Sequence, residues 1–142
     1  MQNKAPFRAK SWKDYGISKN RYRELKYFSL QYEQKKKASR SDPLANEDTR
    51  FIRESAKAAA RLGGYPEGWT QVMACVTEGR PYQNLLLHFD TVYWCERDFY
   101  DVRRAYFALL DEQLTQRLHR TISAEIDDPG GATMTIDGVG IG

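Results

Sequence analysis

The sequence predicts an all-α fold, and three observations support that prediction. Apolar residues recur at helical spacing through most of the chain. The breaks between these periodic segments coincide with glycine or proline, which end helices. A hydrophobic fraction of 41%, of which aromatic residues are a large part, is enough for a modest core in 142 residues. We therefore expect a small helical domain with appendages.

The best-defined unit spans residues 65–118. Three helices are expected in it: Trp69 to Glu78, Tyr82 to Phe89, and Cys95 to about Leu118. Gly79 should end the first as a left-handed cap. The inward-facing residues of the third are expected to be Phe99, Val102, Tyr106 and Leu109. This order is typical of a C-terminal helix-turn-helix, whose last helix enters the major groove of DNA.

The connection before the third helix is unusual. The loop from Asp90 to Cys95 exceeds the turn of about three or four residues that such motifs use. Its Thr-Val-Tyr-Trp run, residues 91–94, also fits a short strand.

Charge divides the chain unevenly. Residues 1–40 hold 12 Lys/Arg and 3 Asp/Glu, a net charge of +9, whereas residues 41–142 hold 10 and 16, a net charge of −6. A basic arm before an acidic body is a common layout for nucleic-acid binding, because cations neutralise phosphates and release counterions. Residues 65–112 hold only 4 basic and 8 acidic residues. Either the arm supplies the phosphate contacts or the unit is a protein-interaction bundle.

The basic arm, residues 1–40, is expected to contain one helix. Ser18 is its predicted N-cap, and the helix should run to about Lys36. Cations crowd its first turns, namely Lys19, Arg21, Arg23 and Lys26. Positive charge at a helix start opposes the macrodipole, so helix stability alone explains it poorly. A phosphate partner explains it, and so does a solvated surface on which such pairs are worth only tenths of a kcal/mol.

The flanking segments carry less information. Residues 41–64 read as a linker followed by an alanine-rich scaffold helix, which begins at Leu44 or Thr49 and ends before Gly63-Gly64. Residues 119–142 read as a flexible glycine-rich tail, with a short strand from Ala132 to Ile136 as the alternative.

The third helix of residues 65–118 carries the sharpest functional hypothesis. With its apolar face turned inward, the residues left for DNA are Arg97, Tyr100, Arg103 and Arg104. Arginine can bind guanine or phosphate with two hydrogen bonds, and tyrosine can donate to phosphate. The alternative is that Asp101 pairs with Arg97 and Arg104, at helical spacing, on a solvated face.

Patterns for catalysis, metal binding and cofactor binding are absent from the sequence. Cys75, His88, Cys95 and His119 lack metal-ligand spacing, and no glycine-rich phosphate loop occurs. We therefore expect no enzyme, no metal and no cofactor. No segment approaches the roughly 20 apolar residues that span a bilayer, and two cysteines make no disulfide framework. These features predict a cytoplasmic protein that does not bind a membrane.

Several motifs resemble a group of small prophage proteins from Gram-positive bacteria. The similar stretches begin at Tyr15-Gly16-Ile17-Ser18, at Val76-Thr77-Glu78-Gly79 and at Phe99-Tyr100, within residues 11–114. They are similar to late-phage transcriptional activators of the RinA and ArpU kind. The resemblance implies a C-terminal helix-turn-helix similar to region four of sigma factors, with residues 82–89 as the support helix and the helix from Cys95 as the recognition helix.

Together these observations predict a phage-derived, DNA-binding transcription regulator in the cytoplasm of a bacterial host. Its expected partner is double-stranded DNA, with RNA polymerase and a second copy of the chain as further candidates. Two alternatives remain open. One is a small DNA-packaging subunit of the terminase kind, and the other is a helical interaction or virion-associated protein whose arginines only solvate its surface.

Overall fold

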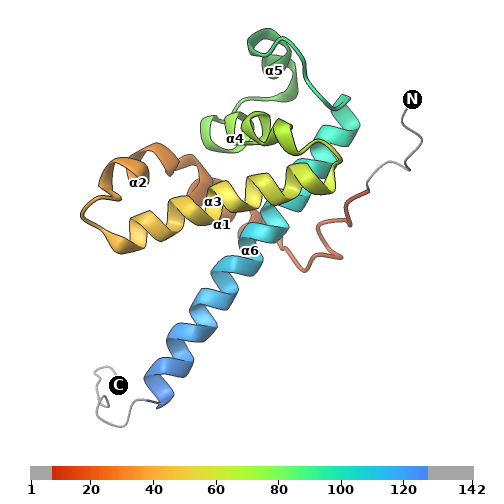
Figure 1. Cartoon of the computed structure of the whole chain (residues 1–142). Coiled ribbons are helices and arrows are strands. Elements are labelled where there is room, and N and C mark those ends of the chain that lie inside the picture. The colour runs from red at the N-terminus through yellow and green to blue at the C-terminus, as the bar shows by residue number, and fades with distance from the viewer. Residues whose placement is uncertain (1–7, 128–142) are drawn as a thin grey trace. The chain divides into compact units, whose positions relative to one another are not determined.

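The computed structural model describes residues 8–127, and within them it is all-helical, with no strand. Its helices are α1 (Lys19–Leu30), α2 (Tyr32–Ala38), α3 (Pro43–Leu62), α4 (Trp69–Glu78), α5 (Tyr82–His88) and α6 (Glu96–Asp127), with a 3-10 turn, η1 (Pro66–Gly68), before α4 (Figure 1). The chain divides into two units after Asp111. The predicted all-α class is confirmed for the described residues.

The N-terminal helix begins as predicted but ends early. The Ser18 side chain accepts a hydrogen bond from the Arg21 N–H, so Ser18 is the N-cap of α1. A single helix to Lys36 was the wrong prediction, because α1 stops at Leu30 and α2 starts at Tyr32. Just before the break, the Ser29 hydroxyl donates to the Leu25 carbonyl. This contact back to the preceding turn loosens the helix and favours a bend.

The helix α2 then packs on α3. The Lys35 ammonium pairs with the buried Asp48 carboxylate at 3.0 Å and lies over the Phe28 ring. The helix α3 begins at Pro43, earlier than either predicted start, because Asp42 caps it by accepting hydrogen bonds from two backbone N–H groups. Much of the expected linker is therefore helical. Small residues along the inner face of α3 allow neighbouring helices to approach closely. They are Ala45, Ser55, Ala56, Ala59 and Ala60.

The three helices expected after residue 65 are all present. The bounds of α4 match the prediction, and Gly79 follows it in the left-handed conformation at φ 71°. The helix α5 ends one residue early, at His88. The predicted end of the last helix near Leu118 was wrong, because α6 reaches Asp127. No glycine or proline lies between Leu118 and that residue to stop it.

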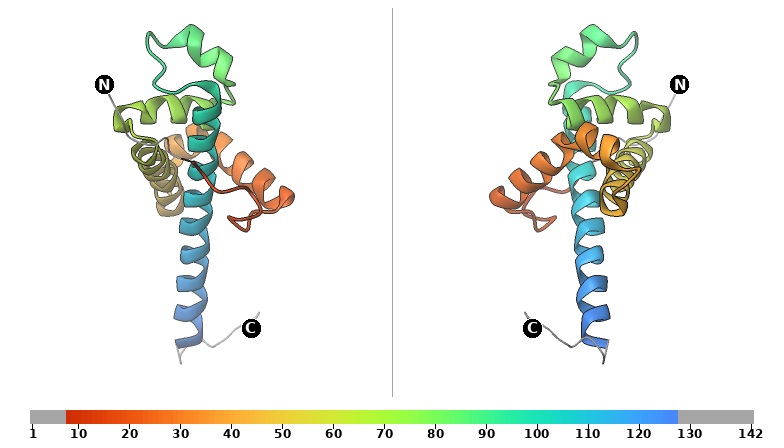
Figure 2. Two further views of the ribbon diagram at one scale, coloured as in Figure 1. Left: turned by 90° about the vertical axis from the view of Figure 1, so that its right-hand side faces the viewer. Right: turned by 90° about the vertical axis from the view of Figure 1, so that its left-hand side faces the viewer.

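The core of the first unit forms around the first half of α6, which lies between α1 and α3 in both views of Figure 2. Phe99, Val102 and Tyr106 are buried as predicted, whereas Leu109 is half-exposed. From α1, Leu25 and Ser29 are fully buried, and the Ser29 hydroxyl lies 2.8 Å from that of Tyr106. The second unit, as far as it is described, consists of residues 112–127 of α6.

The long connection between α5 and α6 serves to bury Trp94. Residues 91–94 form no strand, so that alternative was wrong. The Trp94 indole is 4% exposed, and its N–H donates to the Gly63 carbonyl at 3.0 Å. A Cβ on Gly63 would lie 2.8 Å from the indole nitrogen, and one on Gly68 would lie 2.5 Å from the ring. Both positions therefore need glycine to admit the tryptophan.

The predicted tail, including the alternative strand Ala132–Ile136, falls mostly outside the described residues, although residues 119–127 are helical. Among the helices of residues 8–127, none has the length and apolar content needed to cross a membrane.

Candidate nucleic-acid interface

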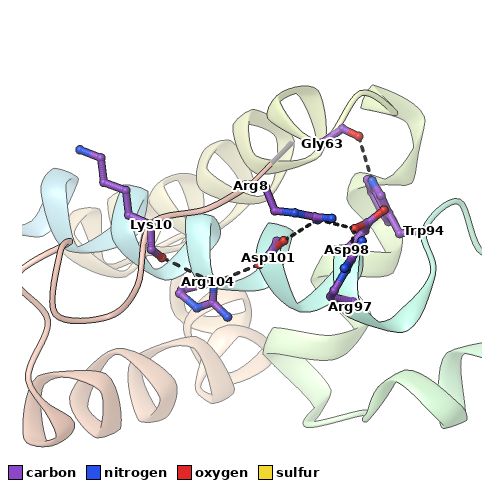
Figure 3. Close-up of polar contacts among 8 residues, drawn as sticks. All are labelled: Arg8, Lys10, Gly63, Trp94, Arg97, Asp98, Asp101 and Arg104. Carbon is purple, nitrogen blue, oxygen red and sulfur yellow. Dashed lines mark hydrogen bonds and ion pairs between the residues drawn. The ribbon is translucent and has the colours of Figure 1, made fainter. Parts of the chain in front are cut away.

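The N-terminal segment runs alongside the first turns of α6 and binds them (Figure 3). The Arg8 guanidinium bridges two carboxylates, at 2.8 Å from Asp98 and 3.1 Å from Asp101. Further along, the Arg104 guanidinium donates to the Lys10 carbonyl at 3.5 Å. Arg8 of the arm therefore binds two acidic residues of α6, the helix that was expected to face DNA.

The two outer arginines of α6 have different surroundings. Arg97 is the most exposed of the predicted reading residues, with 73% of its side chain accessible, and its nearest carboxylate is Asp98 at 3.8 Å. Arg104 pairs with Asp101 at 3.0 Å and lies over the Trp12 ring. The helical pair between Asp101 and Arg104 thus forms, while Arg97 pairs with a different residue from the one expected.

Tyr100 and Arg103 lie half-buried on the side of α6 that faces α1 and α4. The Tyr100 hydroxyl accepts a hydrogen bond from the Tyr82 N–H at 3.3 Å. The Arg103 guanidinium donates to the Tyr22 hydroxyl at 2.5 Å and lies 5.4–5.7 Å from the centres of three aromatic rings, those of Tyr22, Tyr100 and Phe107. No carboxylate contacts Arg103 within residues 8–127.

The predicted cations of α1 also separate into two groups. Arg21 pairs with Asp111 at 2.6 Å and with Glu24 at 3.0 Å, so it serves the fold. Lys19 and Arg23 are exposed, and the Arg23 guanidinium donates a hydrogen bond to the Asn20 side-chain oxygen at 3.3 Å. The first turn of α1 contains no acidic residue.

Lys19, Arg23 and Lys26 form one continuous surface, which we call the α1 stripe. They stand at i, i+4 and i+7, so they share a face of the helix, and all three are exposed. None has an ion-pair partner in the part of the chain that the structure describes. The sequence already indicated this stripe, because its cations oppose the helix macrodipole.

Two residues that sequence reasoning did not single out, Arg8 and Arg80, also belong to this region. Arg8 binds the start of α6, and Lys26 and Arg80 line a pocket together with Arg103. Arg80 follows the left-handed Gly79, a turn visible in the sequence, but its convergence with α1 and α6 depends on tertiary packing.

We expect the pKa of Asp98 to report the attachment of the N-terminal segment. The hydrogen bond from Arg8 holds the pKa of Asp98 below its ordinary value. The carboxylate therefore favours the folded state above its unfolded pKa, and this contribution is lost as the pH falls through the lowered folded pKa. In an NMR pH titration, Arg8→Gln should raise the pKa of Asp98 more than Arg97→Gln does. An equal rise in both variants would mean that Arg8 does not bind this carboxylate in solution.

Within residues 8–127, no group of three or more His, Cys, Asp or Glu side chains is placed to hold a metal ion. Cys75 is buried, Cys95 is exposed, and neither forms a disulfide. Comparison with known proteins finds no matching family model, no matching curated protein and no matching solved structure. The similarity to phage activators therefore stays a prediction.

Proposed function

We propose that the chain binds duplex DNA and regulates transcription in a phage or prophage, with the α1 stripe contacting the sugar-phosphate backbone. One observation carries the proposal: three exposed cations share a face of α1 and have no ion-pair partner among the described residues, and the first of them, Lys19, stands in the first turn, where the helix dipole disfavours positive charge. Phosphates supply the negative charge that the fold does not, and their counterions are released on binding.

In this proposal, α4, α5 and α6 correspond to the expected helix-turn-helix, with α6 as the recognition helix. Its four predicted residues differ in their surroundings, and this supports different roles for them. Arg97 is 73% exposed and its Asp98 partner lies at 3.8 Å, so its guanidinium can reach a base edge, whereas Arg103 and Arg104 are held by closer contacts within the fold. We therefore expect base reading to depend on Arg97 and phosphate contacts to depend on the α1 stripe.

The salt dependence of duplex binding tests the backbone contacts. We expect Lys19→Gln with Arg23→Gln to flatten the slope of log affinity against log salt by about 1.8, because each phosphate contact contributes about 0.9. Lys36→Gln with Lys37→Gln removes the same charge from the exposed end of α2 and is the matched control. Equal effects of the two pairs would show that only net charge matters. Wild-type protein without measurable duplex affinity would refute the proposal.

A second function, protein interaction, is favoured by apolar side chains left in solvent. Leu118, Ile122 and Ile126 recur every fourth residue of α6 and are 57%, 43% and 76% exposed. Leu87 of α5 is 82% exposed. Residues four apart share one face of a helix, so the three α6 side chains form an apolar stripe of the kind that marks association sites. A concentration-dependent mass by light scattering, combined with no duplex binding, would favour this function over the first.

A further inference from the structure

A pocket of about 190 Å³ opens between α1, the turn after α4, and α6. Its rim is exposed at Lys26 and Gly79, and its floor consists of the buried Cys75, Val76 and Phe107. Sites for drug-sized ligands measure roughly 300–1,000 Å³. This pocket is therefore too small for an organic molecule of that size, and it suits one compact polar group.

The charge of its lining specifies the sign of that group. Lys26, Arg80 and Arg103 line the pocket from three separate elements, and no carboxylate lines it. Glu78 pairs with Arg80 at 2.6 Å but stands outside the lining. The mutual repulsion of these three positive charges raises the free energy of the empty pocket, and a bound anion would relieve that repulsion.

Hydrogen-bond donors remain unused at the same place. Arg80 uses its Nε on Glu78 and one Nη1 donor on Asn84, and other N–H groups of its guanidinium are left over. The Arg103 guanidinium donates to the Tyr22 hydroxyl, and it also contacts the Cys75 thiol. The Tyr100 hydroxyl accepts from Tyr82 and so keeps its own proton to donate.

We propose that this pocket binds a single phosphoryl group, held by the guanidinium groups of Arg80 and Arg103 and by the Lys26 ammonium. Guanidinium groups bind phosphate oxygens with paired, charge-assisted hydrogen bonds, and the aromatic rings around Arg103 hold its guanidinium in position.

The position of the pocket indicates the source of the phosphoryl group, and this step rests on the proposed function. Lys26 belongs both to the α1 stripe and to the pocket rim. Lys19 and Lys26 are separated by about 10 Å along the helix axis, given a rise of 1.5 Å per residue. A DNA strand that follows the stripe would therefore reach the pocket with one of its next phosphates.

Cys75 offers a direct probe of occupancy, because its thiol lies in the pocket floor and contacts Arg103. In Cys95→Ser protein, Cys75 is the one thiol, since the chain has two cysteines. We expect inorganic phosphate to slow alkylation of Cys75 by neutral iodoacetamide, compared with chloride of equal ionic strength. At phosphate concentrations about ten times the dissociation constant, the rate should fall about tenfold. Duplex DNA should protect the thiol as well.

Variants in the same background locate the effect. Arg103→Gln and Arg80→Gln should abolish protection by phosphate and flatten the salt slope of DNA binding by about 0.9 each. Arg97→Gln, which lies outside the pocket, should keep the protection. Thermal unfolding by circular dichroism identifies any variant that fails to fold. If one of the two pocket variants does not fold, the other still tests the site.

Each outcome decides a separate point. Unchanged alkylation with phosphate, or equal protection in the pocket variants, overturns the phosphoryl site even if the protein binds DNA. Protection by phosphate in a protein without duplex affinity supports the site and refutes the proposed function. Protection by phosphate but not by bound DNA supports the site and overturns the backbone as its source.

Discussion

Trp94→Ala is expected to lower the free energy of unfolding by about 3–5 kcal/mol, the range measured for deletion of buried aromatic side chains. The indole is 4% exposed and packs against the rings of Tyr65, Tyr93 and Phe99. Its removal leaves a cavity and takes away the donor to the Gly63 carbonyl. Because single domains have total stabilities of about 5–15 kcal/mol, the loss should be a large part of the whole.

Urea denaturation followed by circular dichroism measures this change, and Trp69→Ala is the matched control. Trp69 is half-buried and has the Lys57 ammonium 4.7 Å from its ring centre. We expect its truncation to cost about 1 kcal/mol. Similar losses at both tryptophans would mean that the connection between α5 and α6 does not hold its indole in the core.

Trp94 also marks the limit of what local sequence reveals. The pattern of residues 91–94 fits a strand, and the glycines at 63 and 64 read only as the end of a helix. In the structure the Trp94 indole packs against Gly63 and Gly68, because the missing Cβ atoms of these glycines leave the space that the ring fills. A spacing rule acts over a few residues, whereas this contact spans 31 positions.

Helix positions were predictable where local physics decides them. Ser18 as N-cap and Gly79 as left-handed cap follow from side-chain chemistry and φ preference. The break at Gln31 was missed, because the Ser29 hydroxyl turns back to the Leu25 carbonyl, and its second partner, the Tyr106 hydroxyl, is supplied only by tertiary packing. The late end of α6 was missed for a different reason: its polar residues were read as a fading helix, although none of them stops one.

The candidate site was predictable in its residue types but not in its roles. Lys19 and Arg23 are exposed as the pattern indicated. Arg103 and Arg104 were expected on the exposed side of α6, but both are half-buried and bind within the chain, Arg103 to Tyr22 and Arg104 to Asp101. Helical periodicity separates inside from outside, and it does not show which outer residues another segment covers.

The pair formed by Ser29 and Tyr106 gives a second large effect. Both side chains are fully buried, and their hydroxyl oxygens lie 2.8 Å apart. Burial raises the pKa of Tyr106 well above its ordinary value, so the phenol stays protonated and remains a donor. Since Ser29 donates to the Leu25 carbonyl, the geometry makes Tyr106 the donor to Ser29.

This direction predicts an asymmetry between the two single variants. Ser29→Ala leaves the Tyr106 hydroxyl buried without an acceptor and should lower the free energy of unfolding by about 1–3 kcal/mol. Tyr106→Phe leaves the Ser29 hydroxyl with its bond to Leu25 and should cost about 0.5–1.5 kcal/mol. The double variant should cost less than the sum, by about 1 kcal/mol, because no orphaned donor remains. Urea denaturation of the four proteins measures the cycle; additive losses, or a larger loss for Tyr106→Phe, would rule out the assigned donor.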